Sequence, residues 1–265
     1  MAKKTAMEIR DMKGAKKIVA LTSYSYWMTT IIYQVDIDLI LVGDSLASVM
    51  LGYKDTIPVT MDEMIHHTKA VSRAKPDSLI VADMPFMSYQ VSSEQAVENA
   101  GRLIKEAGAE AIKLEGGKQI EDAVYRIVQA GIPVLGHIGL TPQSIHQIGG
   151  YRVQGRDSAK AKNLVEDALL LEETGAFAVV LECVPYSLAK DITKKLHIPT
   201  IGIGAGPYCD GQILVIHDML GLKTGHVPKF VKQYSNLTEP IAKALEAYKK
   251  DVYAGKFPDK EHSYE

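Results

Sequence analysis

Short apolar runs rich in valine and isoleucine recur along the chain, with helix-like segments between them. Strands that are covered on both faces need near-continuous apolar sequence, so each run predicts a strand of a parallel sheet. The predicted strands are Ile18–Thr22, Leu39–Val42, Leu79–Ala82, Ala111–Leu114, Pro133–Gly136, Ala178–Leu181, Thr200–Ile203 and Ile213–Ile216.

The segments between these runs have helical periodicity and helix-capping residues. In residues 92–109, Ser92 or Ser93 can cap a helix whose small and apolar residues repeat every three or four positions. Residues 161–176 show a similar pattern and end at Gly175, and Thr60 precedes a third such segment. Repeated strand–helix–strand units imply right-handed crossovers, and eight of them favour a closed (β/α)8 TIM barrel over an open sheet. No linker or block of charge divides the chain, which predicts a single (β/α)8 barrel domain over residues 1–265.

Composition excludes several classes of protein. The 265 residues are 46% hydrophobic, enough for one large core, and the net charge of −2 provides no basic field for nucleic acid. Cys183 and Cys209 lack the spacing of a zinc site or disulfide framework, which fits a reducing compartment. No apolar run approaches the roughly 20 residues that span a membrane, and the first residues lack the apolar core of a signal peptide. We therefore expect a cytoplasmic protein that binds neither nucleic acid nor membrane.

Four acidic residues follow apolar runs, and they carry most of the functional information. They are Asp44, Asp83, Glu115 and Glu182. In a parallel barrel the carboxyl ends of all strands open onto one face, where active sites are built. Asp44, Asp83 and Glu115 follow neighbouring strands, and their oxygen ligands suit Mg²⁺, which keeps positions open for substrate and water. The alternative is that each aspartate caps a helix or turn.

Three further side chains lie at predicted strand ends. Lys113 shares one face of its strand with Glu115, and it either binds a substrate carboxylate or enolate oxygen, or forms an ion pair with Glu115. Glu182 has apolar neighbours and is a candidate general base, or else a buried acid satisfied by backbone amides. His137 either contacts substrate or is an interior histidine with a structural partner. His66 and His67 lie in a predicted helix without carboxylates at ligand spacing, and we interpret them as structural.

A glycine-rich segment, residues 198–212, spans the end of the seventh strand and the approach to the eighth. Its glycines permit close approach of the backbone to a ligand, and phosphate binds at this place in many barrels. A phosphate-binding loop is therefore a competing interpretation of this segment.

Eight motifs occur in one order that resembles the ketopantoate hydroxymethyltransferase family over about residues 15–240. They are VGDS at 42–45, VTMDEMIHHTKAV at 59–71, ADMPFMSY at 82–89, KLEGG at 113–117, GHIGLTPQS at 136–144, GGYRVQGR at 149–156, LECVP at 181–185 and IGIGAGPYCDGQILVIHDMLG at 201–221. The resemblance implies a barrel of the phosphoenolpyruvate/pyruvate superfamily type, assembled as a homodecamer of two pentameric rings.

The resemblance also implies a reaction and a set of site residues. The reaction is hydroxymethyl transfer from 5,10-methylenetetrahydrofolate to 3-methyl-2-oxobutanoate through a Mg²⁺-stabilised enolate, giving 2-dehydropantoate in pantothenate biosynthesis. The implied roles are metal ligands at Asp44, Asp83 and Glu115, substrate binding at Asp44, Ser45, Asp83, Lys113 and His137, and proton acceptor at Glu182. Two positions depart from the family pattern: Ser25 stands where Asp is common, and Ala47 where Gly is common.

Other functions remain compatible with the same residues. A carbon–carbon lyase of the same superfamily would also use Mg²⁺ and the enolate of a 2-oxo acid, but no folate. A non-catalytic barrel and a sugar-phosphate isomerase are further alternatives, and the intact set of acids with Lys113 disfavours the first of these two.

Overall fold

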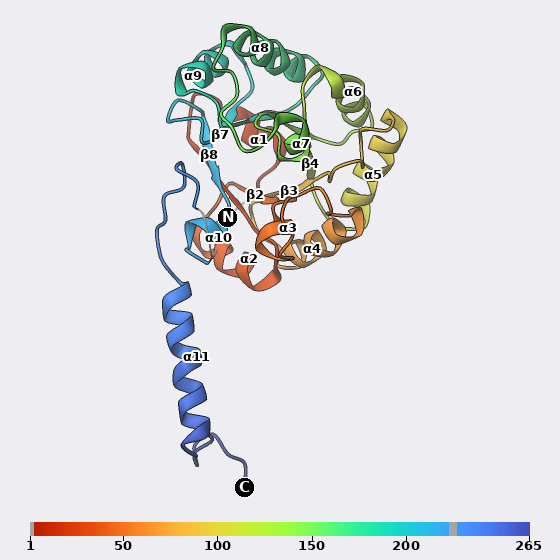
Figure 1. Cartoon of the computed structure of the whole chain (residues 1–265). Coiled ribbons are helices and arrows are strands. Elements are labelled where there is room, and N and C mark those ends of the chain that lie inside the picture. The colour runs from red at the N-terminus through yellow and green to blue at the C-terminus, as the bar shows by residue number, and fades with distance from the viewer. Residues whose placement is uncertain (1–2, 223–226) are drawn as a thin grey trace. The chain divides into compact units, whose positions relative to one another are not determined.

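Eight parallel strands form a closed barrel in the computed structural model, which describes residues 3–222 and 227–265 (Figure 1). The strands are β1 (Ile18–Thr22), β2 (Leu39–Val42), β3 (Leu79–Asp83), β4 (Ala111–Glu115), β5 (Val134–Gly139), β6 (Ala178–Glu182), β7 (Thr200–Ile203) and β8 (Gly211–Leu214). Each strand pairs with the next, and β8 pairs with β1 to close the barrel. The predicted (β/α)8 fold is therefore confirmed.

The eighth strand begins two residues earlier than its apolar run predicted. It covers Gly211–Leu214, and Ile216 instead begins the short helix α10 (Ile216–Met219). In the pairing with β1, Gly211 lies opposite Ile18, where a Cβ would come within 2.6 Å of the Ile18 backbone oxygen. The glycine permits this close approach of the two strands. A search for apolar residues alone could not detect that the strand begins at a glycine.

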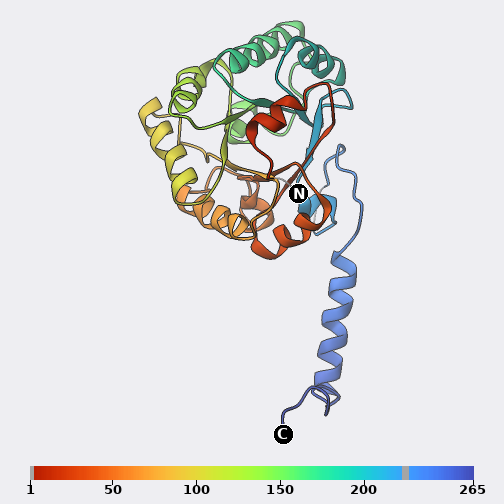
Figure 2. The ribbon, with the colours of Figure 1, turned by 180° about the vertical axis from the view of Figure 1, so that it is seen from behind.

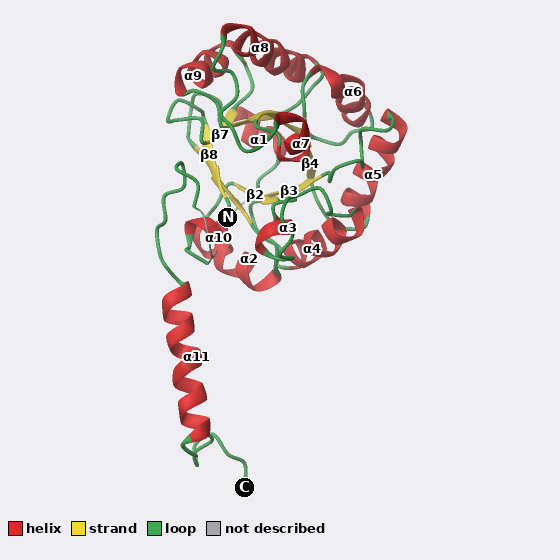
Figure 3. Cartoon of the chain, viewed as in Figure 1, coloured by secondary structure: helices red, strands yellow, loops and turns green. Residues whose placement is uncertain are grey.

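Helices surround the strands, as Figure 3 shows by colour. The longer ones are α2 (Tyr26–Ile32), α4 (Met61–Arg73), α5 (Ser93–Lys105), α6 (Glu121–Gln129), α8 (Ser158–Glu173) and α9 (Tyr186–Lys195). The predicted caps are present: the Ser92 side chain accepts a hydrogen bond from Gln95 N, and Thr60 forms a reciprocal capping box with Glu63. Five shorter elements lie in connections, namely η1 (Tyr33–Val35), α3 (Leu46–Val49), η2 (Lys118–Ile120), η3 (Pro142–Ser144) and α7 (Ile145–Ile148).

The amino-terminal end of the barrel is filled by apolar side chains and covered by α1 (Ala6–Asp11). Thr5 and Glu8 form a capping box that begins this helix, which the sequence analysis did not predict. Ala6 and Ile9 are buried in one cluster with inward-facing strand residues such as Leu135. Figure 2, seen from behind, shows α1 in red across this end. The opposite end, where the strands finish, is left for polar groups.

Contacts within the chain divide it into two compact units, residues 1–215 and 216–265. The first contains the whole barrel. The second contains α10 and the longer helix α11 (Thr238–Tyr253), and Tyr248 of α11 packs its ring 5.6 Å from that of Phe257. That residues 1–265 form a single domain stays a prediction. Across the described residues, no helix combines the length and apolar character needed to cross a bilayer.

Gly139, the last residue of β5, has a backbone conformation and surroundings that exclude a side chain. Its φ is +98°, and a Cβ would lie 2.2 Å from the backbone oxygen of Glu182. We expect Gly139→Ala to lower the free energy of unfolding by more than about 2 kcal/mol, because it adds a backbone clash to the strain of a positive φ. Urea denaturation would measure the loss.

Gly149→Ala provides the matched control. Gly149 also has a positive φ of +77°, but a Cβ there would meet no atom within 4 Å. Gly149→Ala should lower the free energy of unfolding by about 1 kcal/mol, because it adds backbone strain alone. Equal losses in the two variants would show that the close approach of Gly139 to Glu182 is not energetically important.

Candidate functional site

The acidic residues predicted at strand ends come together with Lys113 and His137 at the carboxyl end of the barrel. Strand register brings Asp83 beside Lys113 and Glu115 beside His137, and Gly139 at the end of β5 pairs with Glu182. Asp44 follows β2 by two residues. Five of these side chains belong to residues that are 6% exposed or less, namely Asp44, Asp83, Lys113, Glu115 and His137. Ionisable groups buried this deeply must be paired or used in chemistry.

Lys113 is the positive centre of the cluster. Its Nζ lies 2.5 Å from Oδ1 of Asp83 and 3.6 Å from Oε1 of Glu115. Burial opposes its charge, but the surrounding carboxylates outweigh burial and raise the pKa of Lys113 above its ordinary value. Of the two interpretations left open by the sequence, the ion pair is present, with Asp83 closer to the ammonium than Glu115.

The carboxylates carry more negative charge than Lys113 can balance. Burial, together with the charges of Asp83 and Glu115, raises the pKa of Asp44 well above its ordinary value. Burial also raises the pKa of Asp83, although Lys113 opposes the shift. A buried group of oxygen donors short of positive charge fits a hard divalent cation such as Mg²⁺.

The predicted set of three metal ligands is not arranged around one point. Within residues 3–222 and 227–265, no three His, Cys, Asp or Glu side chains are grouped closely enough to hold one ion. Oδ2 of Asp83 accepts a hydrogen bond from Asp44 N at 3.0 Å, which keeps the two aspartates adjacent. Ligation by Asp44, Asp83 and Glu115 together stays a prediction.

His137 lies between two acids. Its Nδ1 is 3.4 Å from Oε1 of Glu115 and its Nε2 is 3.2 Å from Oε2 of Glu182, although neither contact is aligned as a hydrogen bond. Burial and Lys113 act against its charge, but the two carboxylates prevail and raise the pKa of His137 to about 9. His137 is therefore an imidazolium at neutral pH. It lies between Glu182 and Glu115, and Glu115 in turn contacts Lys113.

Glu182 differs from the other acids in its access to solvent. Its side chain is 15% exposed, whereas those of Glu115 and Asp83 are each 2% exposed. The carboxylate can therefore meet a molecule that enters from the open end of the barrel. Position and access together suit a group that exchanges a proton with a substrate.

Ser45 lies at the edge of this cluster, half-buried, with its Oγ 2.8 Å from the phenol oxygen of Tyr24. Gly43, two residues earlier, leaves room for the Ser45 side chain. A Cβ on Gly43 would lie 2.9 Å from Oγ of Ser45 and 3.4 Å from Oδ2 of Asp83. The two departures from the family pattern lie nearby. Ser25 caps α2 by accepting from Met28 N at 3.4 Å, a role that Asp fills equally well, and Ala47 is fully buried in α3.

Two residues of the cluster were not predicted as site residues. Gln143, 3% exposed, donates from its backbone N to Glu115 Oε2 and from its Nε2 to Asp44 Oδ2, each at 3.0 Å. Tyr89 places its hydroxyl 2.7 Å from Oε1 of Gln143. Both residues belong to the motifs that carry the resemblance, but a neutral amide and a phenol have no charge pattern that would mark them.

Other sequence candidates have structural partners. Gly206 lies in the predicted phosphate-binding segment and has a φ of +79°. If it carried a side chain, its Cβ would lie 2.4 Å from the Cβ of Tyr186. The close approach that its conformation permits is therefore to a side chain of the protein. His67 Nδ1 lies 2.7 Å from the backbone oxygen of Tyr24, in accord with a structural role. Cys183 and Cys209 are free thiols.

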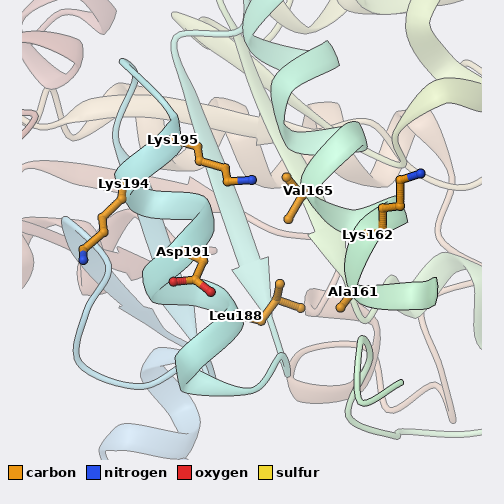
Figure 4. A pocket seen from close by; sticks show the side chains of 7 residues that line it. All are labelled: Ala161, Lys162, Val165, Leu188, Asp191, Lys194 and Lys195. Carbon is orange, nitrogen blue, oxygen red and sulfur yellow. The ribbon is translucent and has the colours of Figure 1, made fainter. Parts of the chain in front are cut away.

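A surface hollow of about 300 Å³ lies between α8 and α9, outside the barrel (Figure 4). Lys162, Lys194, Lys195 and Asp191 line it above an apolar floor. None of its lining residues belongs to the carboxylate cluster, so it is not part of the candidate site.

Comparison with known proteins gives one consistent result. The family model of ketopantoate hydroxymethyltransferase matches residues 3–260. The 3-methyl-2-oxobutanoate hydroxymethyltransferase of Thermoanaerobacter sp. (strain X514) is 59% identical over 252 residues, which cover 95% of this chain and 92% of the relative. The enzyme of the same name from Moorella thermoacetica (strain ATCC 39073 / JCM 9320) is 56% identical, with both chains covered completely.

Solved structures support the fold. A 2,3-dimethylmalate lyase, described as a PEP mutase/isocitrate lyase superfamily member, has a TM-score of 0.61 and 17% identity, covering 97% of this chain and 91% of its own. A phosphonopyruvate hydrolase in complex with oxalate and Mg²⁺ has a TM-score of 0.62 and 11% identity, covering 98% and 93%. These likenesses are of the fold, and they agree with the closed barrel of the structure.

Proposed function

The chain belongs to the ketopantoate hydroxymethyltransferase family, and we propose that its buried cluster activates 3-methyl-2-oxobutanoate for carbon–carbon bond formation. The reaction is transfer of a hydroxymethyl unit to C3 of this keto acid, giving ketopantoate in pantothenate biosynthesis. We propose 5,10-methylenetetrahydrofolate as the donor of the one-carbon unit. The observation that carries the proposal is the separation of charge: crowded carboxylates around Lys113 at one side, and the more exposed Glu182 beside His137 at the other.

Asp44 and Asp83, with Glu115 beside them, are the residues that would hold Mg²⁺. Their crowded negative charge supports this part of the proposal, because it leaves Asp44 with a pKa raised well above its ordinary value. When bound, the cation would supply Lewis-acid polarisation of the 2-oxo group, which acidifies the neighbouring C3 proton. The phosphonopyruvate hydrolase of similar fold was solved in complex with oxalate and Mg²⁺, which is consistent with this part of the proposal.

The protein's own groups account for the proton and the developing charge. Glu182 takes the C3 proton, and the electron pair of the broken C–H bond moves into the enolate. Lys113, fixed by Asp83, stabilises the enolate oxygen. His137, 3.2 Å from Glu182, orients the carboxylate that accepts the proton. The enolate carbon then forms a bond to the methylene carbon of the folate, and both carbon–nitrogen bonds of that carbon break. Water supplies the hydroxyl oxygen of the product, and the C3 proton and one proton of the water go to the two nitrogens of the released tetrahydrofolate.

Proton NMR of 3-methyl-2-oxobutanoate in D₂O tests the proposed function. With protein and Mg²⁺ but no folate, we expect the C3 proton to exchange with solvent. Ketopantoate should appear only after methylenetetrahydrofolate is added. Cleavage of a 2-oxo acid without folate would favour the lyase, and neither exchange nor product would favour the non-catalytic barrel.

Metal binding by Asp44 can be measured separately from turnover. We expect Asp44→Asn to raise the Kd for Mg²⁺ in isothermal titration calorimetry at least about tenfold, because it removes a charged oxygen donor. Asp38→Asn is the matched control. Asp38 is an equally buried aspartate that accepts from Val19 N at the other end of the barrel, so its variant should bind Mg²⁺ as the unaltered protein does. The same Kd in both variants would remove Asp44 from the site.

The remaining expectations form part of the proposal. Family membership supports assembly into a homodecamer and a cytoplasmic location. Ser45, half-buried beside Asp44 and bonded to Tyr24, is proposed to bind the keto acid.

A further inference from the structure

Gln143 connects the ends of three neighbouring strands through its side chain and its backbone N. It lies in η3, just after β5, and is 3% exposed. Its Nε2 donates to Oδ2 of Asp44 at 3.0 Å, beyond β2, and to the backbone oxygen of Met84 at 2.9 Å, beyond β3. Its backbone N donates to Oε2 of Glu115 at 3.0 Å, at the end of β4.

The amide of Gln143 has one orientation that satisfies its surroundings. Its Oε1 accepts from the Tyr89 hydroxyl at 2.7 Å and from Gln90 Nε2 at 3.3 Å. The opposite orientation would place Oε1 against the oxygens of Met84 and Asp44, and a backbone oxygen cannot donate. Both Nε2 hydrogens therefore point at fixed acceptors. Tyr89 is itself held, because its hydroxyl accepts from Glu115 N at 3.2 Å.

We propose that Gln143 is a positioning residue that fixes Asp44 and Glu115 relative to each other for cation and keto-acid binding. This inference rests on the proposed function. By holding Oδ2 of Asp44 and Oε2 of Glu115, Gln143 sets the direction of the other oxygen of each carboxylate. Oε1 of Glu115 consequently faces Lys113 and His137, at 3.6 and 3.4 Å. Groups that hydrogen-bond metal-ligating carboxylates tune both the orientation and the affinity of the site.

The test is Gln143→Met, which keeps the length of the side chain and removes its amide. Calorimetry on the protein without keto acid should show the Kd for Mg²⁺ raised about 10- to 100-fold. In the D₂O exchange assay, the KM for 3-methyl-2-oxobutanoate should rise more than kcat falls, because Glu182 and its contact with His137 are untouched. A purely structural role would lower the midpoint of thermal unfolding and leave both binding constants unchanged.

Gln90→Met is the matched control, since Gln90 is exposed, donates to the outer side of the Gln143 amide at 3.3 Å and accepts from Tyr89 N at 3.4 Å, but among the described residues makes no hydrogen bond to Asp44 or Glu115. Its Kd for Mg²⁺ should stay within about twofold of the unaltered value. Tyr89→Phe removes the hydroxyl that orients Oε1 of Gln143. We expect it to raise the Kd for Mg²⁺ as well, but by less than Gln143→Met does. If Gln143→Met does not fold, Tyr89→Phe decides the question.

The outcomes separate this inference from the proposed function. An unaltered Kd for Mg²⁺ in both Gln143→Met and Tyr89→Phe would overturn the positioning role while the proposed function stands. If the unaltered protein neither bound Mg²⁺ nor exchanged the C3 proton, the proposed function would fall, and the positioning role with it.

Discussion

Replacing Glu182 by Gln should slow exchange of the C3 proton of 3-methyl-2-oxobutanoate by about 10²- to 10⁴-fold, the usual contribution of a general base. Glutamine preserves the shape of the side chain and an oxygen that can face His137 Nε2, but an amide cannot accept the proton. The affinities for Mg²⁺ and keto acid should change little, because Glu182 lies on the far side of His137 from Lys113. The measurement is the initial rate of deuterium incorporation at saturating keto acid.

Glu166→Gln makes the same chemical change at an exposed position of α8, where Glu166 has only a 3.6 Å contact with Lys162. It should exchange at the unaltered rate. Nearly full exchange in Glu182→Gln would mean that another group takes the proton. A large rise in the Mg²⁺ Kd of that variant would instead place Glu182 in the cation site.

Replacing Lys113 by Met should lower the free energy of unfolding at neutral pH by about 3–5 kcal/mol, the cost of breaking a buried ion pair by removing one partner. Asp83 would lose its contact at 2.5 Å, and Glu115 the ammonium at 3.6 Å. Asp44, Asp83 and Glu115 would then share a buried site, with His137 still in contact with Glu115. Urea denaturation at constant ionic strength would measure the difference.

The pH dependence gives this prediction a second readout. Lys113 lowers the pKa of Asp83 and of Glu115, so its removal raises both in the folded protein. A carboxyl whose folded pKa lies above its unfolded value destabilises the fold above that folded pKa, and this penalty disappears below the unfolded pKa. The loss in free energy of unfolding caused by Lys113→Met should therefore become smaller as pH falls from 7 toward about 4, which is near the pKa of carboxyl groups in an unfolded chain.

Lys118→Met, at an exposed position of η2 after the same strand, should change stability by less than about 0.5 kcal/mol at either pH. A deficit in Lys113→Met that does not vary with pH would point to lost packing of the lysine stem and not to uncompensated carboxylates.

The sequence predicted the charged part of the site because strand geometry determines it. Lys113 and Glu115 are two positions apart on one strand, and alternation alone places both on the inner face. Apolar runs located seven strand beginnings to within one residue, and Asp44, Asp83 and Glu182 followed from the ends of those runs. Family membership then supplied the reaction, which no spacing of residues could specify.

Gln143 and α1 show what strand patterns do not reveal. The contacts of Gln143 join Asp44, Met84 and Tyr89, and these contacts arise only when the loop after β5 folds back over earlier strands. A neutral amide carries no periodicity from which to predict this. By contrast, the four residues Thr5 to Glu8 have the spacing of a capping box, a local signal from which the start of α1 could have been predicted.

The cover that α1 forms over the amino-terminal end has a consequence for the order of events at the site. Because Ala6, Ile9 and the apolar strand residues around them fill that end, we expect ligands to reach the site from the carboxyl ends of the strands. In the proposed function the keto acid contacts Lys113 and the one-carbon donor approaches it from the same end, so we expect the keto acid to bind first. We expect the products to leave in the reverse order, which is an ordered kinetic scheme.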